Sequence, residues 1–166
     1  MKLLVLSDSH SALSFMRQCI DAVKPDAIVH LGDHFDDGEA LQEEYPGTPF
    51  YTVPGNCDRY RCPPGTPEVL MDLVCGVKLY MTHGHRHQVK QYLGGLLKDA
   101  RACRAQAALY GHTHVADCTL EEDGMWVLNP GSCGYGGGSA GLILTEGRNI
   151  ITCRILRDAD LELMRE

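Results

Sequence analysis

The sequence predicts an α/β fold in which mixed sheets pack face to face, with helices on their outer sides. In the first half, buried strands alternate with helices, an order that requires parallel strands joined by right-handed crossovers. The second half changes to adjacent strands and hairpins, which pair antiparallel. The chain has 166 residues, a length that suits one domain with a substantial core. We therefore expect a single domain over residues 1–166.

Three strands are expected in the first half, at residues 2–7, 27–31 and 50–53. Residues 11–23 predict a helix because apolar side chains recur every three or four positions, at Leu13, Met16, Ile20 and Val23. Pro25 ends this helix. A short helix over residues 38–44 precedes the third strand.

The second half begins with two adjacent strands, at residues 69–74 and 77–82. A helix is expected from about residue 87 to residue 104, although Gly94 and Gly95 interrupt its pattern. The remaining elements are a strand at 107–110, a hairpin of 115–121 with 126–128, a glycine-rich loop at 131–141, and a hairpin of 142–145 with 150–155.

Five short segments carry metal-binding side chains, and each follows a predicted strand. The side chains are those of Asp8, His10, Asp33, Asn56, His83, His112 and His114. Ligand sites of α/β sheets gather at the carboxyl ends of strands, so these segments are expected to converge. Taken singly, most of them also fit a helix cap or a turn. The pair His112 and His114, which follows a glycine and a buried strand, rarely serves packing alone.

Seven oxygen and nitrogen donors exceed what one metal ion needs, so the set predicts a site for two divalent cations. Two-metal sites are typical of enzymes that attack phosphate esters.

These segments resemble the motifs of the calcineurin-like metallophosphoesterase superfamily. The matching motifs are Asp-x-His at 8–10, Gly-Asp at 32–33, Gly-Asn at 55–56, His-Gly at 83–84 and Gly-His-x-His at 111–114. The short length, Gly-Asn-Cys-Asp at 55–58 and Asn-Pro-Gly-Ser at 129–132 resemble its small YfcE-like phosphodiesterase branch. The resemblance covers nearly the whole chain and implies a four-layer α/β/β/α sandwich.

The resemblance also implies roles for the seven residues. Asp8, His10, Asp33 and His114 would hold the first metal, and Asp33, Asn56, His83 and His112 the second. Asp33 would bridge the two ions, and a water or hydroxide between them would be the nucleophile. Manganese is the metal that the resemblance suggests, with nickel, iron or zinc as alternatives. The substrate would be a small phosphate ester.

Position 57 departs from the family pattern, because many relatives have a histidine there that helps to protonate the leaving group. Cys57 could donate a proton, although an ordinary thiol is poorly matched to that task at neutral pH. Alternatively, Cys57 only packs. Asp58 is a second candidate, but an ordinary aspartic acid is already ionised.

Several residues near the motifs each have two possible roles. Arg59 and Arg61 could bind a substrate phosphate or be solvated surface residues. His85, Arg86 and His87 could contact a phosphate or form an outer shell around the metal ligands. The loops 57–67 and 131–141 are expected to influence specificity, since the chain has no room for a large cap domain.

The net charge of −7 argues against broad binding to nucleic acid or to membrane surfaces. No signal peptide or membrane span is evident, so we expect a cytoplasmic protein with reduced cysteines. The eight cysteines form no Cys-x-x-Cys pair, although their even number leaves disulfides open. The sequence does not decide whether the chain forms a homo-oligomer.

Two other functions fit the same features. The chain could be a non-catalytic scaffold, like the retromer subunit that resembles this group, because fold does not fix function. It could also store or sense metal.

Overall fold

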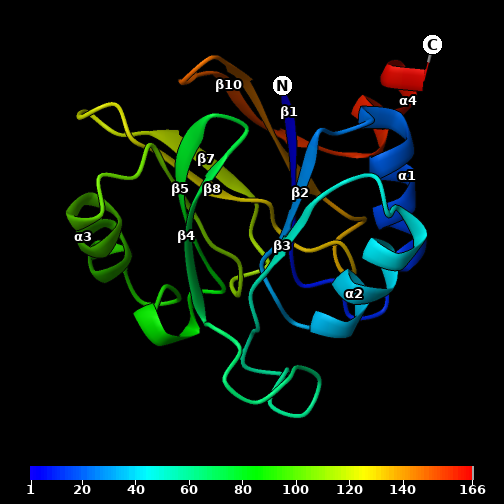
Figure 1. Ribbon diagram of the computed structural model, residues 1–166, viewed down its shortest axis with the longest axis horizontal. Coiled ribbons are helices and arrows are strands. Elements are labelled where there is room, and N and C mark those ends of the chain that lie inside the picture. Colours follow the sequence, from blue (N-terminus) through cyan, green and yellow to red (C-terminus); the bar gives the residue numbers. More distant parts are fainter. Residues whose placement is uncertain (166) are drawn as a thin grey trace.

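Two five-stranded sheets pack face to face in the computed structural model, which describes residues 1–165 (Figure 1). In chain order the elements are β1 (Lys2–Leu6), α1 (Leu13–Val23), β2 (Ala27–His30), α2 (Phe35–Glu44), β3 (Phe50–Thr52), β4 (Val69–Val74), β5 (Val77–Thr82), the 3₁₀-helix η1 (His85–His87), α3 (Gly94–Ala102), β6 (Ala107–Leu109), β7 (Asp117–Leu120), β8 (Trp126–Asn129), β9 (Ala140–Glu146), β10 (Asn149–Leu156) and α4 (Asp158–Arg165).

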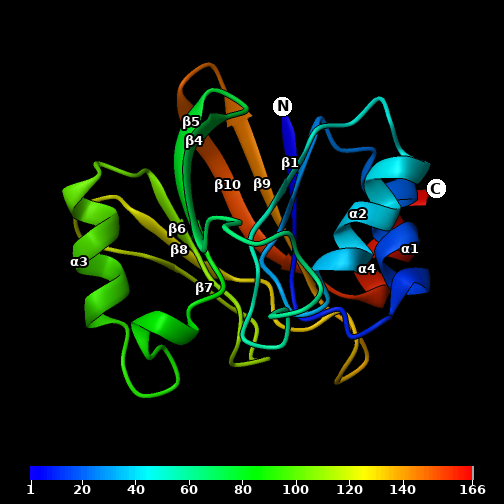
Figure 2. The same ribbon diagram turned by 60° about the horizontal axis from the view of Figure 1, so that its bottom comes forward.

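Both sheets are mixed, as the sequence predicts. The first sheet has the order β10-β9-β1-β2-β3, in which β1, β2 and β3 are parallel and β9 runs antiparallel to β1 and β10. The second sheet has the order β4-β5-β6-β8-β7, with β5, β6 and β8 parallel. Helices α1, α2 and α4 lie on one side of the molecule and α3 on the other (Figures 1 and 2). The four-layer α/β/β/α sandwich is confirmed.

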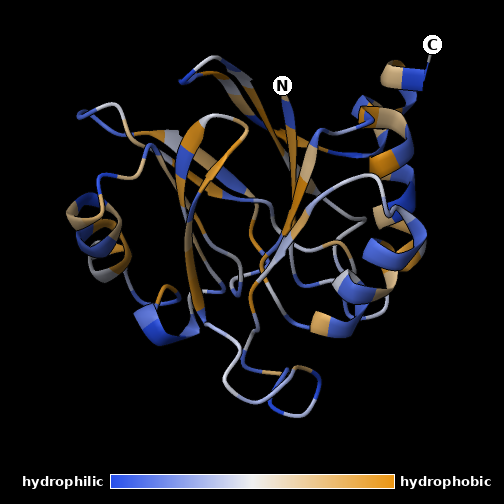
Figure 3. Ribbon diagram, in the orientation of Figure 1, coloured by the Kyte–Doolittle hydropathy of each residue, from blue (hydrophilic) through white to orange (hydrophobic). Residues whose placement is uncertain are grey.

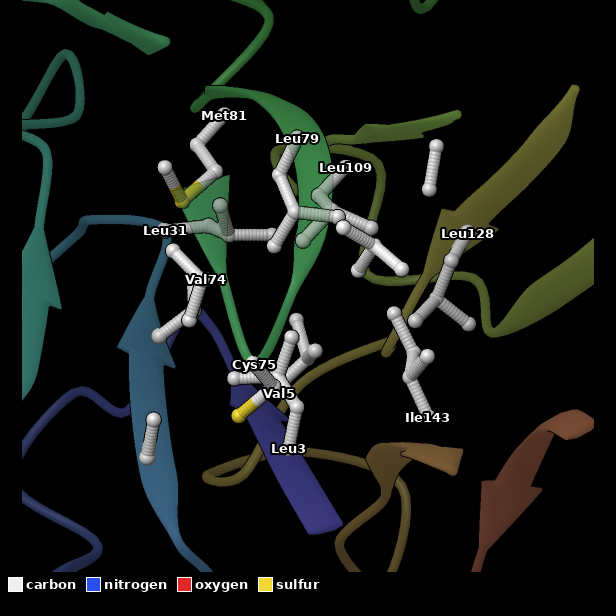
Figure 4. Packing of buried hydrophobic residues seen from close by; sticks show 14 of the residues in the cluster. Leu3, Val5, Leu31, Val74, Cys75, Leu79, Met81, Leu109, Leu128 and Ile143 are labelled. Carbon is white, nitrogen blue, oxygen red and sulfur yellow. The ribbon is translucent and has the colours of Figure 1, made fainter. Parts of the chain in front are cut away.

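The alternation of side chains along β1 explains the layers. Leu3 and Val5 point into the space between the sheets, whereas Leu4 and Leu6 point toward the helices. Opposite β1, Leu79 and Leu109 fill the same space from the second sheet (Figure 4). Every residue of β1 after Lys2 is buried, which explains why this strand is a continuous apolar run.

The helices bury one face each against the outer sides of the sheets. Met16 and Ile20 of α1 pack on the first sheet, and Leu96 and Ala100 of α3 pack on the second. Figure 3 shows the consequence: apolar residues dominate the strands, while the helices mix apolar and polar residues. This is the pattern of helices with one solvent-facing side.

The predicted helix over residues 87–104 is wrong in extent. Residues 85–87 form the 3₁₀-helix η1, which ends at Gln88 in a left-handed conformation, and α3 begins only at Gly94. The two glycines therefore start the helix and do not interrupt it. A left-handed residue cannot continue an α-helix, which explains why the pattern breaks at this point.

Helix α4 was not predicted, and α2 starts three residues earlier than expected. Asp160 accepts a hydrogen bond from the backbone N–H of Arg157 at 2.8 Å, a contact that caps the start of α4. Leu161 is buried beside α1 in the core of the first helical layer. One apolar turn of this length carries too little periodicity to be recognised in the sequence.

No helix within residues 1–165 is both long enough and apolar enough to cross a membrane.

Core packing between the sheets predicts a large difference between two leucines on neighbouring strands. Leu79 of β5 is fully buried, whereas Leu73 of β4 is 67% exposed. Leu79→Ala should lower the free energy of unfolding by roughly 2–5 kcal/mol because it leaves a cavity, and Leu73→Ala by less than about 0.5 kcal/mol. Urea unfolding of both variants measures this, and equal losses would contradict the placement of the core.

Candidate metal centre

The seven predicted donors come from both sheets and lie on loops that follow the carboxyl ends of strands. Asp8, Asp33 and Asn56 follow β1, β2 and β3 of the first sheet. His83 and His112 follow β5 and β6 of the second sheet. The packing of the two sheets therefore determines whether the donors can meet.

The structure brings the first predicted group together. Asp8, His10, Asp33 and His114 each offer one donor atom, and these four atoms lie within 4.8 Å of one another. His114 Nε2 lies 3.0 Å from Asp8 Oδ1, and His10 Nε2 lies 3.9 Å from Asp33 Oδ2. Within residues 1–165, Asp8 Oδ1 and His10 Nε2 are buried polar atoms without a hydrogen bond, because the approach of His114 Nε2 to Asp8 Oδ1 is close but lacks hydrogen-bond geometry. Such atoms are rare and point to an interaction with something other than protein.

The second predicted group is arranged around His83. Its Nδ1–H donates to the carbonyl oxygen of Leu31 at 2.7 Å, so in the neutral ring Nε2 carries the lone pair. This nitrogen lies 3.1 Å from Asn56 Oδ1 and 3.5 Å from Asp33 Oδ2. With the ring in this neutral form, three acceptors face one another with no donor between them, an arrangement that a cation would stabilise. The His112 ring lies 5.0 Å from the His83 ring.

The donor chemistry fits divalent cations. Carboxylate, imidazole and amide oxygen are ligands for borderline and hard metal ions, and no thiolate is among them. Asp33 belongs to both groups, because its Oδ2 faces His10 and His83. This is the position that a bridging carboxylate requires.

The backbone at the site is held in left-handed conformations. Five residues have positive φ angles: Asp8 at 51°, His10 at 43°, Asp33 at 57°, His112 at 70° and His114 at 59°. Such angles are uncommon for residues other than glycine and cluster at functional sites, where the surrounding structure must enforce them.

Asp58 enforces the geometry of two of these loops. Its buried carboxylate accepts four backbone N–H groups, from Asp33 at 2.8 Å, His34 at 2.9 Å, Phe35 at 2.9 Å and Gly55 at 2.7 Å. Asp58 is therefore a structural acceptor that joins the β2 and β3 loops, and its suggested role as a proton donor is wrong. Sequence reasoning missed this function, since the four partners are not recognisable from spacing.

Asn129 and Ser132 hold the remaining loops. Asn129 Nδ2 donates to the carbonyl oxygen of Gly111 at 3.1 Å and to Thr113 Oγ1 at 2.8 Å. Ser132 Oγ donates to the carbonyl oxygen of Asp8 at 2.7 Å. The segment 129–132, which matched the family only as a motif, thus positions His112, His114 and Asp8.

Gly55 and Gly111 are required by close approach of the donors. A Cβ at Gly55 would overlap the carboxylate of Asp33, and a Cβ at Gly111 would overlap Ser7 Oγ and lie 2.7 Å from Asp8 Oδ2. The glycines of the Gly-Asn and Gly-His-x-His motifs therefore make room for the carboxylates.

A buried network supports the loop that carries Asp8 and His10. Ser9 Oγ donates to Asp37 Oδ2 at 2.7 Å and lies 3.0 Å from His30 Nε2. The ring nitrogen Nδ1 of His30 accepts the N–H of Gly32 at 3.3 Å, so Nε2–H is the donor toward Ser9. His30 is fully buried and serves structure.

Burial favours the neutral form of two histidines, which is the form that can bind a metal ion through a ring nitrogen. Desolvation, together with the nearby His83, lowers the pKa of His112 to about 4. Desolvation also lowers the pKa of His10, although Asp33 and Asp8 oppose the shift. For Asp33, burial alone would raise the pKa, but His83 and the N–H of Cys57 lower it further than burial raises it. At neutral pH these groups are therefore in the protonation states that metals bind.

Cys57 is exposed, which argues against the interpretation that it only packs. Its backbone N–H donates to Asp33 Oδ1 at 3.0 Å, and its thiol lies 3.5 Å from Asn56 Nδ2. Partial desolvation and the Asp33 carboxylate raise the pKa of the thiol, which keeps the proton on sulfur at neutral pH.

The arginines suggested as phosphate ligands have other partners. Arg61 pairs with Asp36 at 2.9 Å, Arg86 donates to Glu68 at 2.9 Å, and the guanidinium of Arg59 lies 5.4 Å from the ring of Tyr60. All three side chains are on the surface. By contrast, His85 faces the site, because its ring lies 5.5 Å from that of His83.

Tyr135 from the glycine-rich loop forms a wall of the site. Its ring stacks on His114 with centroids 5.3 Å apart and meets His10 edge-on at 5.1 Å. Sequence reasoning did not single out Tyr135, and only its place in a loop expected near the site pointed to it.

Comparison with known proteins identifies the family of this chain. Residues 1–146 match the family model for the calcineurin-like phosphoesterase superfamily domain. The chain belongs to this superfamily. YsnB of Bacillus subtilis, named a probable metallophosphoesterase, is 35% identical over 134 residues, which cover 80% of this chain and 75% of YsnB.

Solved structures share the fold. A Streptococcus pneumoniae protein described as a predicted phosphoesterase is 28% identical with a TM-score of 0.74, covering 94% of this chain and 88% of its own. The Escherichia coli phosphoesterase YfcE is 23% identical with a TM-score of 0.64, covering 93% and 98%. Vps29 of Entamoeba histolytica, solved with Zn²⁺, is 17% identical with a TM-score of 0.67, covering 95% and 98%. At these last two identities the likeness shows the fold alone.

The role of Asp58 predicts a strong effect of Asp58→Asn. An amide would direct N–H groups at backbone N–H groups and leave buried donors without partners. The free energy of unfolding of metal-free protein should fall by roughly 2–4 kcal/mol. Asp36→Asn, which removes only an exposed ion pair, should cost less than about 1 kcal/mol. Urea unfolding measures the free energy of unfolding of both variants. A similar small loss of stability in the two would contradict the proposal that Asp58 joins the β2 and β3 loops.

Proposed function

We propose that this protein is a phosphodiesterase that depends on two divalent metal ions. The observation that carries the proposal is the pair of converging donor groups that share Asp33. One group contains the partnerless Asp8 Oδ1 and His10 Nε2, and the other contains the acceptors of His83 and Asn56 that face each other at 3.1 Å. Both arrangements favour cations.

The proposed ligand sets follow these groups. The first ion would be held by Asp8, His10, Asp33 and His114, and the second by Asp33, Asn56, His83 and His112. Bound cations would supply positive charge that attracts a phosphate ester, and they would lower the pKa of a bound water toward neutrality. Manganese is our proposed ion, because mixed oxygen and nitrogen donors accept it.

The protein supplies positioning. The hydrogen bond from His83 Nδ1 to Leu31 fixes the direction of its Nε2 lone pair. Asp58 fixes the backbone of Asp33 and of Gly55, next to Asn56. Cys57 lies exposed beside Asp33 and Asn56 with its proton retained, so its thiol is our candidate for delivering a proton to a departing oxygen.

Metal dependence is the first test of this function. Chelator-treated protein should not hydrolyse bis(p-nitrophenyl) phosphate, and added Mn²⁺ should restore activity. Calorimetric titration of the metal-free protein should give two bound ions. His10→Ala or His114→Ala should remove one, and His112→Ala or His83→Ala the other.

His34→Ala is a matched control, since the His34 ring lies 5.0 Å from that of His10 but belongs to neither set. It should keep both ions. Two metals bound without any hydrolysis of phosphodiesters would favour the scaffold function, whereas full activity in metal-free protein would contradict the proposal directly.

The cysteine at position 57 leads us to expect that kcat/KM depends strongly on the leaving group of the substrate. A well-placed general acid contributes roughly 10²–10⁴-fold, and a thiol is weakly suited to this at neutral pH. The wild type should therefore cleave aryl diesters well and alkyl diesters poorly. Cys57→His should raise kcat/KM for alkyl diesters about 10-fold or more, with little change for aryl diesters.

The measurement is log(kcat/KM) plotted against the pKa of the leaving group. Cys62→His, in the same loop, is the control and should follow the wild-type line. Equal slopes for wild type and Cys57→His would mean that residue 57 does not act on the leaving group.

A further inference from the structure

Two cysteines from different sheets meet at the edge of the inter-sheet core. Cys118 lies on β7 and Cys153 on β10, and their sulfur atoms are 3.2 Å apart and share a hydrogen bond. β7 is the last strand of the second sheet, and β10 is the first strand of the first sheet. The sequence gives no sign of this contact, because the residues are 35 positions apart.

The register of the strands explains why the thiols face each other. Cys118 pairs across its ladder with Leu128, and Cys153 with Ile143. Both partners point into the core between the sheets (Figure 4). Side chains of cross-strand neighbours lie on the same face of a sheet, so both thiols enter the space between the two sheets.

No second pair of cysteine thiols is in hydrogen-bond contact in the described part of the chain, residues 1–165. Cys153 is buried, whereas Cys118 is partly exposed and can meet a small reagent. The contact between the two sulfur atoms lowers the pKa of Cys118 and, together with burial, raises that of Cys153, so Cys118 is the thiol of the pair that loses its proton first. A thiol with these properties is the one that reacts first.

We propose that Cys118 and Cys153 form a redox modification site, in which a small disulfide such as oxidised glutathione joins them in a bond between the sheets. The Cys118 thiolate attacks the small disulfide, forms a mixed disulfide and releases one thiol. The Cys153 thiolate then attacks the Cys118 sulfur and releases the second thiol. Two cysteine sulfurs are oxidised, the small disulfide is reduced to two thiols, and these carry the two protons that the cysteines lose.

The bond would link the two sheets that carry the metal donors. Asp8, Asp33 and Asn56 follow strands of one sheet, and His83 and His112 follow strands of the other. Within the described residues the sheets are joined by the chain, by apolar packing and by hydrogen bonds such as those from His83 to Leu31 and from Thr145 to Cys75. A disulfide across 35 residues restricts the unfolded chain, so the oxidised protein should unfold at a temperature higher by roughly 5–10 °C.

The test uses folded, metal-free wild-type protein in glutathione buffers that range from reduced to oxidised. After free thiols are blocked, digestion with trypsin and a glutamate-specific protease separates Cys118 from Cys133 and from Cys153. Mass spectrometry should find the Cys118 peptide linked to the Cys153 peptide in oxidised buffer only. Circular dichroism should show the higher unfolding temperature in the same samples.

Cys118→Ser and Cys153→Ala should lose both the linked peptide and the temperature shift, while Cys103→Ser, another partly exposed thiol, should keep both. The proposal is overturned if the exposed Cys57 becomes glutathionylated but no link between Cys118 and Cys153 forms. It is equally overturned if the link forms without raising the unfolding temperature. Neither readout depends on metal or on hydrolysis.

Discussion

Four backbone N–H groups converge on the carboxylate of Asp58, and the candidate metal centre depends on this contact. The hydrogen bonds join residues 33–35, after β2, to Gly55, after β3. They hold Asp33 in a left-handed conformation that costs free energy on its own. Because Asp33 is the residue that both donor groups share, a displaced Asp33 would disturb the whole set.

The site is assembled between two sheets, so its geometry follows from the packing of the core. Leu3 and Val5 of the first sheet contact the layer formed by Leu79 and Leu109 of the second. This apolar contact sets the distance between the donors of one sheet and those of the other. Hydrophobic burial is not directional, which explains why specific hydrogen bonds are needed to fix the loops. Asp58 accepts such bonds, and Asn129 and Ser132 donate them.

Membership of the calcineurin-like phosphoesterase superfamily and the donor geometry support the same function by separate routes. The family model rests on sequence, whereas the partnerless Asp8 Oδ1 and the facing acceptors of His83 and Asn56 rest on structure. Cys57 is the position at which the sequence analysis expects a departure from the family motif. Its exposure beside the donors makes the leaving-group experiment informative.

The sequence by itself determined which side chains could bind metal and that they follow strands, because short-range periodicity and motif spacing carry this information. It also predicted the mixed sheets. Only the tertiary structure decided the function of Asp58, the anchoring by Asn129 and Ser132, the late start of α3 and the meeting of Cys118 with Cys153. These features depend on backbone groups and side chains that are distant in the sequence, and packing of the two sheets is the step that places them together.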